Sequence, residues 1–161
     1  MIYVTVGNHD KPFDRLIAAM DRAAAELGED VVMQTGVSQS RLRHAKGEPF
    51  FTYDKAEELI KSASAVVAHA GIGTIIACRT HGTPLVICPR RAAQGEHLND
   101  HQREIADELS KNPRPGVAVA LEESDIVKTL AALRRAGRPA PGNSDTTRGL
   151  TDFLRDYINA I

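Results

Sequence analysis

The chain has 161 residues, with 20 basic and 21 acidic side chains and a formal net charge of −1. This length suits one domain with a real core, and the near-neutral charge gives no bulk attraction to nucleic acid or anionic lipid. Aromatic residues make up only 4% of the chain, which argues against a base-stacking surface. No apolar run reaches the roughly 18 residues of a membrane span, and Met1 leads directly into a strand-like segment instead of a signal peptide. We therefore expect a cytoplasmic protein that binds no nucleic acid and meets a membrane only through a partner.

Hydrophobic patterning predicts strands and helices in alternation. In chain order we expect strand 2–6, helix 12–27, strand 30–35, a polar loop 37–47, strand 49–53, helix 55–62, strand 65–68, helix 74–80, strand 84–88, helix 99–109, strand 116–121 and helix 122–135. Such alternation is typical of an α/β fold: a Rossmann-like parallel sheet with helices on both faces. We assign residues 1–136 to this domain, residues 137–147 to a linker rich in Pro and Gly, and residues 148–161 to an amphipathic helix.

The central strand–helix–strand unit contains a turn suited to phosphate. Gly71 and Gly73 lie between the strand at 65–68 and the helix that begins at Thr74. Glycines at such a turn lack Cβ atoms and allow a ligand to approach the backbone. The start of the helix directs unpaired N–H groups and a positive dipole end toward the same space. A Gly-x-Gly turn before a helix is a weak signal alone, since a tight turn without a ligand has the same pattern.

A polar loop follows the next strand, at the sheet edge where open α/β folds bind ligands. Guanidinium groups suit phosphate, and carboxylate, amide and imidazole groups suit sugar hydroxyls. The loop is either an ordinary solvated segment or, together with the glycine turn, a nucleotide-sugar site. Its polar residues are Arg90, Arg91, Gln94, Glu96, His97, Asn99, Asp100, His101 and Gln102.

The sequence indicates no metal centre. Cys78 and Cys88 fall in a helix and a strand, and their spacing fits no zinc pattern, so we expect buried thiols in a reducing compartment. Neither an Asp-x-Asp motif nor a cluster of His and Cys is evident, and we expect no metal requirement.

Four ordered motifs give the chain a family resemblance: VTVGNHDKPFDRLI, FTYDKAEELI, VVAHAGIGT and GEHLNDHQREIADEL. The chain resembles the carboxyl-terminal, donor-binding domain of glycosyltransferase family 28, which forms half of the GT-B architecture. It is most similar to the free-standing versions, which are bacterial exopolysaccharide subunits of the PssE type and the catalytic subunit of the eukaryotic dolichol-linked GlcNAc transferase. Only the segment beyond about residue 137 lacks a recognisable motif.

The resemblance implies roles for residues that match the family motifs. His69, Gly71, Gly73 and Thr74 would contact the donor diphosphate, although His69 could instead fix the turn. The donor sugar would meet residues at the start of the next helix, where two of them could also serve as a helix cap. These sugar-side residues are Asn99, Asp100, His101 and Gln102, with Glu96 and His97 as weaker candidates.

One position departs from the family. Many relatives carry a carboxylate three residues after the position of Thr74, where it accepts hydrogen bonds from the ribose hydroxyls. This chain has Ala77 there. Either another group holds the ribose, with Glu96 as a possible substitute, or nucleotide selectivity is loosened.

The first turn supplies a candidate base. Gly7, Asn8 and His9 follow the first strand at its carboxyl end, and the ordinary pKa of histidine suits proton transfer from an acceptor hydroxyl. A surface histidine in a turn is the alternative reading of His9, because two-domain relatives usually take the base from the other domain.

The resemblance implies a UDP-sugar-dependent hexosyltransferase subunit that needs neither a metal nor another cofactor. The acceptor would be lipid-linked or a polysaccharide, and a membrane-anchored acceptor-binding partner or a second copy would complete the cleft. An apolar stripe in residues 150–161 would contact that partner or pack on the chain's own sheet. Two alternatives stay open: a nucleotide-sugar binding module without turnover, and a generic Rossmann enzyme with a dinucleotide. The first turn, GNHDKP, is not the G-x-G-x-x-G that a dinucleotide enzyme would need.

Overall fold

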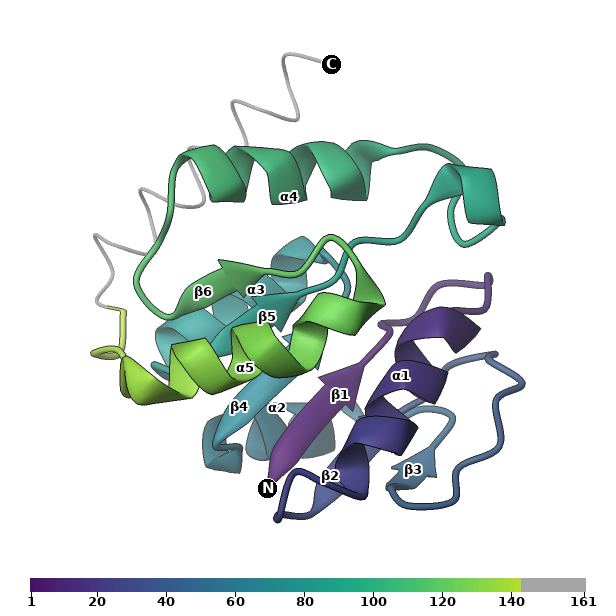
Figure 1. Ribbon diagram of the computed structural model, residues 1–161, viewed down its shortest axis with the longest axis horizontal. Coiled ribbons are helices and arrows are strands. Elements are labelled where there is room, and N and C mark those ends of the chain that lie inside the picture. Colours follow the sequence, from purple (N-terminus) through teal and green to yellow (C-terminus); the bar gives the residue numbers. More distant parts are fainter. Residues whose placement is uncertain (143–161) are drawn as a thin grey trace.

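The computed structural model describes residues 1–142, which form a six-stranded parallel sheet covered by helices (Figure 1). The sheet has the order β3-β2-β1-β4-β5-β6, and every neighbouring pair is parallel. The strands are β1 (Ile2–Thr5), β2 (Val31–Gln34), β3 (Lys46–Glu48), β4 (Ala65–Ala68), β5 (Leu85–Ile87) and β6 (Val117–Val119). The helices are α1 (Asp14–Ala24), α2 (Tyr53–Ser62), α3 (Ile72–Thr80), α4 (His101–Lys111) and α5 (Ile126–Arg135), with 3₁₀ turns η1 (Ala92–Gln94) and η2 (Glu123–Asp125). The predicted Rossmann-like fold is confirmed.

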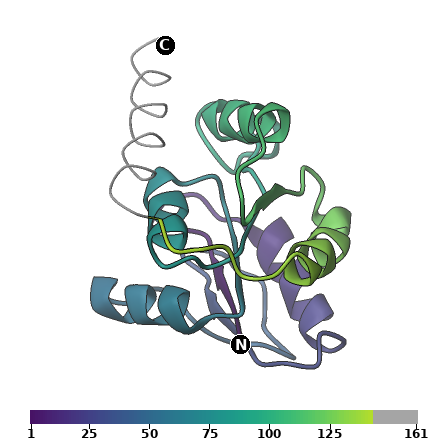
Figure 2. The ribbon, with the colours of Figure 1, turned by 90° about the vertical axis from the view of Figure 1, so that its left-hand side faces the viewer.

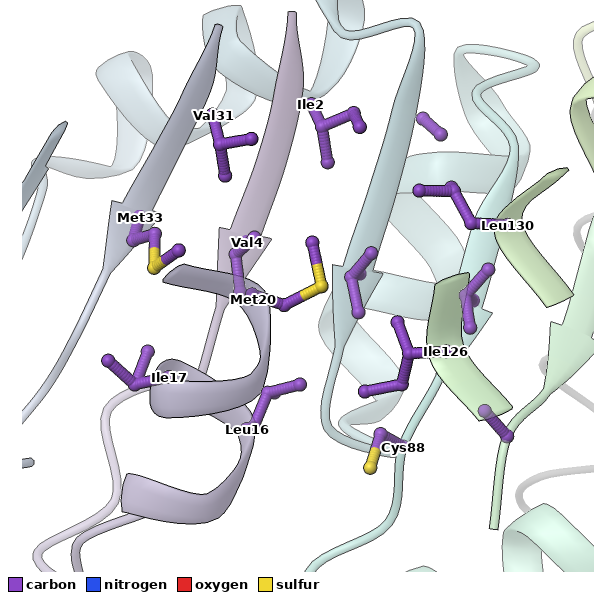
Figure 3. Packing of buried hydrophobic residues seen from close by; sticks show 14 of the residues in the cluster. Ile2, Val4, Leu16, Ile17, Met20, Val31, Met33, Cys88, Ile126 and Leu130 are labelled. Atoms are coloured by element: carbon purple, nitrogen blue, oxygen red, sulfur yellow. The ribbon is translucent and has the colours of Figure 1, made fainter. Parts of the chain in front are cut away.

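The sheet separates two hydrophobic cores, because successive strand side chains point to opposite faces. On β1, Ile2 and Val4 pack with α1 and α5, whereas Tyr3 packs with α2, α3 and α4. Figure 2 shows α2 and α3 on one side of the sheet and α1 and α5 on the other. Figure 3 shows how Leu16 of α1 and Ile126 of α5 close over the first face. With both faces covered, the inner strands read as continuous apolar runs.

The third strand was predicted wrongly. It is β3, Lys46–Glu48, inside and just after the segment expected to be a polar loop, and not residues 49–53. β3 is exposed and pairs only with β2, so nothing selects for apolar residues there. The Asp21 carboxylate of α1 instead fixes the preceding loop by accepting hydrogen bonds from the backbone N–H groups of residues 43–45 at 3.0 Å. Residues 49–51 lead into α2, which begins after the N-cap Thr52.

Helix boundaries shift at the glycine turn. α3 begins at Ile72, two residues earlier than predicted, so Gly73 lies in the first helical turn and Gly71 is the N-cap. α4 begins at His101, immediately after Asp100. Both shifts bring sequence-predicted site residues to the start of a helix.

The described chain ends close to the domain body. Arg138 donates hydrogen bonds to the carbonyl oxygens of Lys61 and Ala63, and the N–H of Gly142 donates to Arg79. Residues 137–142 therefore contact the domain, and the remainder of the expected linker and the expected helix 148–161 lie outside the described residues. The two cysteines are buried as predicted.

The sheet order places a crevice at its carboxyl edge. From β1 the chain steps outward to β2 and β3, and from β4 it steps the other way to β5 and β6. Helices on either side of this switch point diverge and leave room between β1 and β4, which is where open α/β sheets bind ligands.

Candidate functional site

A cavity of about 580 Å³ opens at this switch point. It runs from the ends of β1 and β2 across the β4–α3 turn and along the groove between α2 and α3. The lining residues are Thr5, Gly7, Asn8, Gln34, Tyr53, Glu57, Ile60, His69, Gly71, Gly73, Thr74, Ile76, Ala77, Thr80 and His81. The structure thus gathers the four predicted diphosphate residues, with Gly7 and Asn8, around one space.

The two glycines of the turn have different surroundings. A Cβ on Gly73 would meet nothing within 4 Å, whereas one on Gly71 would collide with the ring of His69. The carbonyl oxygen of Gly71 accepts a hydrogen bond from the N–H of Ile75, but Gly71 has no side chain that could cap the earlier N–H groups of α3. The cavity is therefore open beside Gly73, and Gly71 makes room for the ring of His69.

His69 is wedged between two backbone segments. Gly7 has a φ of +71°, and a Cβ there would lie 2.5 Å from Cε1 of His69. Burial, with the nearby charge of Arg90, lowers the pKa of His69 to about 4. Nδ1 is buried and has no hydrogen-bond partner among residues 1–142. His69 is thus a neutral ring that spaces the β1 and β4 turns and also borders the cavity.

A buried amide connects the turn after β1 to β2. Nε2 of Gln34 donates to the carbonyl of Gly7 and to Oδ1 of Asn8, each at 3.1 Å. Oγ1 of Thr5 accepts a hydrogen bond from the N–H of Gly7. Asn8 is consequently held at the cavity edge by the fold. Gln34 was not predicted, although a polar residue at the end of an apolar strand was an available signal.

His9 lies outside the cavity lining and pairs with His97. The two ring centroids are 4.6 Å apart with planes inclined by 36°. Partial burial, His97 and the charge of Arg90 lower the pKa of His9, which favours its neutral form near pH 7. The pairing brings together the turn after β1 and the loop after β5, two segments whose contact the sequence does not indicate.

Arg90 lies beneath these loops and does not reach into the cavity. Its buried guanidinium donates to the carbonyl oxygens of Val6, Lys11, Pro12 and Glu96 at 2.9–3.1 Å. It forms no ion pair with any described residue, and burial lowers its pKa to about 10. Both Nη atoms donate to the backbone, whereas Nε is buried and has no hydrogen-bond partner among residues 1–142. Arg90 therefore adds positive charge below the cavity without lining it.

Arg91 and Glu96 are also committed within the protein. Arg91 forms an ion pair with Glu122 at 2.7 Å. Both oxygens of the buried Glu96 accept from Arg15, at 2.9 and 3.0 Å, and Arg15 also pairs with Glu123. Glu96 is therefore poorly placed to substitute for a ribose carboxylate. Arg15 is a residue that sequence reasoning missed, because its partners are 81 and 108 positions away.

The four predicted sugar-side residues lie on the loop and helix start after β5, and none lines the cavity. Oε1 of the buried Gln102 accepts from the N–H of Arg90, and Oδ1 of Asp100 accepts from the N–H of Ala92. Oδ1 of Asn99 accepts from the N–H of His101, a cap-like contact at the start of α4, while Nδ1 of His101 lies 3.1 Å from Glu104. The half-exposed ring of His101 is the side chain here best placed to meet a ligand.

No group of three or more His, Cys, Asp or Glu side chains within residues 1–142 is arranged to hold a metal ion. In the same part of the chain, no helix has the length and apolar character needed to cross a bilayer.

The sheet order is that of a doubly wound Rossmann-like domain, and the cavity lies at its switch point. Residues 1–134 match the glycosyltransferase family 28 C-terminal domain. The chain belongs to this family. No curated protein matches it.

Several solved structures of glycosyltransferases contain a region with a similar fold. The glycotransferase of kitacinnamycin has a TM-score of 0.62 and 18% identity, over 96% of this chain and 39% of its own. The spinosyn forosaminyltransferase SpnP has a TM-score of 0.61 and 18% identity, over 94% of this chain and 39% of its own. The calicheamicin glycosyltransferase CalG4 has a TM-score of 0.58 and 18% identity, over 98% of this chain and 38% of its own. The chain thus spans about two-fifths of the length of these proteins, and at this identity the likeness concerns the fold.

Proposed function

We propose that this chain binds the donor of a nucleotide-sugar glycosyltransferase, with a UDP-sugar as the donor and a hexose as the transferred group. The observation that carries the proposal is the open start of α3. Gly73 leaves space, Thr74 offers a hydroxyl, and uncapped N–H groups of the first turn border the same cavity. A helix start of this kind binds phosphate without a metal.

The same features suit departure of the nucleotide. An acceptor hydroxyl oxygen would attack the anomeric carbon with inversion, and the bond from that carbon to the diphosphate oxygen would break. Charge then grows on the leaving diphosphate, where preorganised N–H groups and the hydroxyl of Thr74 are most effective. Arg90 adds a positive charge beneath the loops that no described carboxylate neutralises by an ion pair. No divalent cation is needed in this scheme.

His9 is our candidate for the base that takes the acceptor proton. Its lowered pKa keeps it neutral and able to accept a proton near pH 7. Its ring lies against His97 at the carboxyl edge of the sheet, on the side where an acceptor domain would face the donor.

We further propose that the acceptor is lipid-linked or a polysaccharide and is held by a membrane-anchored partner, or by a second copy, at the cytoplasmic face of a membrane. The support is the resemblance of the sequence motifs to those of free-standing donor-binding subunits; in the structural neighbours the matching region is about two-fifths of the chain.

Titration calorimetry with UDP, UDP-hexoses and NAD tests the donor class. We expect UDP and at least one UDP-hexose to bind, with the same affinity in the presence of EDTA, and NAD not to bind. Binding of NAD alone would favour a dinucleotide enzyme. Binding of the UDP-hexose with no transfer in any partner complex would favour a non-catalytic module.

A further inference from the structure

Beyond the glycine turn, the cavity continues as a groove between α2 and α3. Tyr53, Glu57 and Ile60 border it from α2, and Ala77 and Thr80 border it from α3. A donor with its diphosphate at Gly73 and Thr74 has this groove open to its nucleoside. From Thr74 to His81 the helix rises about 10 Å, which is long enough for the ribose attached to the diphosphate to lie along it.

A carboxylate faces this part of the groove and is oriented by a histidine. Oε1 of Glu57 lies 3.1 Å from Nε2 of His81, in an arrangement where the imidazole N–H donates. The side chain of His81 is 20% exposed and that of Glu57 is 44% exposed. Oε2 of Glu57 has no hydrogen bond to any residue among 1–142 and is available to a ligand.

The chemistry of this end of the groove suits a vicinal diol. An ionised carboxylate accepts hydrogen bonds only, with lone pairs on both oxygens, and ribose presents two adjacent hydroxyl donors. Ala77 lines the groove with a single methyl group, so it leaves volume where a larger side chain would fill it. Hydrogen bonds to a charged acceptor are stronger than those to a neutral one.

We infer that Glu57, positioned by His81, binds the ribose hydroxyls of the donor nucleotide and makes the site select ribonucleoside over 2′-deoxyribonucleoside diphosphates. This inference rests on the proposed function and adds to it the residues that hold the ribose of the donor. Glu96 cannot serve instead, because both of its oxygens are held by Arg15.

The test compares UDP with 2′-deoxy-UDP, which share the base and diphosphate and differ in one hydroxyl. Calorimetry on the wild-type chain is expected to show UDP binding about tenfold tighter, the effect of one hydrogen bond to a charged group. Glu57→Gln should weaken UDP more than 2′-deoxy-UDP and bring the two affinities within about twofold of each other.

Two further variants separate binding from folding. Glu58→Gln, at a neighbouring exposed carboxylate that pairs with Lys55 and does not line the cavity, should keep the wild-type preference. His81→Ala should reduce the preference, and His81→Gln, which retains an N–H donor, should restore part of it.

The possible results separate a failure of the Glu57 role from a failure of the proposed function. A wild-type chain that binds neither nucleotide overturns both. Tight UDP binding with the same UDP to 2′-deoxy-UDP ratio in wild type and Glu57→Gln overturns the role of Glu57 alone.

Discussion

At the scale of single residues, the ring of His69 accounts for the glycines at positions 7 and 71, which lie on either side of it in space. Its ring occupies the space that a Cβ on Gly7 or Gly71 would need, so glycine at these two positions makes room for the histidine. A Cβ on Gly73 would instead point into the open cavity. The sequence shows three glycines beside polar residues and cannot distinguish these roles, because the distinction depends on where one ring from β4 packs against the turn after β1.

Gly73→Val should abolish UDP binding while leaving the domain folded. The added side chain points into open space, and valine is no worse than glycine in a helix, but its methyl groups would occupy the phosphate position. Circular dichroism checks the fold and calorimetry checks the binding. Undiminished UDP affinity in a folded Gly73→Val protein would refute the diphosphate site.

Thr74→Ala should weaken UDP binding by about 1–3 kcal/mol through the loss of one hydrogen bond to a charged group. Thr129→Ala on α5, outside this cavity, is the matched control and should bind UDP as the wild type does. Equal affinities in the two variants would remove Thr74 from the site.

His69 should make stability depend on pH in the acid range. Its folded pKa of about 4 lies below the ordinary value of 6.5, so the unfolded chain binds the extra proton. The contribution of His69 is complete above pH 6.5 and declines as pH falls toward 4, by on the order of 3 kcal/mol. Urea unfolding of wild type and His69→Gln from pH 7.5 to 4.5 measures this. The difference between the two proteins should shrink with acid, and a constant difference would contradict the buried neutral ring.

At the scale of elements, the alternation of strands and helices was predictable because each inner strand is buried on both faces and each helix has one apolar face. β3 was not, because three exposed residues held by pairing with β2 carry no hydrophobic pattern. The residues of the glycine turn were predicted together with Gly7 and Asn8, which line the same cavity. The far wall of the cavity was not, since Glu57 and His81 lie on separate helices and meet only after packing.

Arg90 joins the loops after β1 and β5, and Arg90→Met should affect both stability and binding. The substitution removes four hydrogen bonds to buried or partly buried carbonyl oxygens, at a cost of about 2–4 kcal/mol. UDP binding should also weaken with the loss of positive charge. Denaturant unfolding and UDP titration measure the two effects.

Arg90→Lys separates these effects, because lysine keeps the charge but cannot make the same set of bonds. It should lose stability while retaining more UDP affinity than Arg90→Met. Equal losses of UDP affinity in both variants would show that Arg90 affects binding through the geometry of the loops and not through its charge.

At the scale of the whole molecule, transfer should require a second protein surface. We expect co-expression with a membrane-anchored acceptor-binding subunit to give a complex with transferase activity that neither chain shows alone. Size-exclusion chromatography and a radiolabelled sugar-transfer assay test this. Efficient transfer to a lipid-linked acceptor by the isolated monomeric chain would refute the two-subunit proposal.

The hydrogen bonds from the loop before β3 to the Asp21 carboxylate make the attachment of β3 sensitive to acid. Backbone hydrogen bonds from residues 43–45 lower the pKa of this carboxyl, so the tether stays intact above the ordinary range of aspartate and is lost as pH falls through the lowered value. Its protonation would release β3 before the inner strands separate, leaving the hydrogen-bonding groups of β2 unpaired along the sheet border. Such a border is a template for another chain, so self-association in strong acid should begin there, with the amides of residues 43–48 exchanging first.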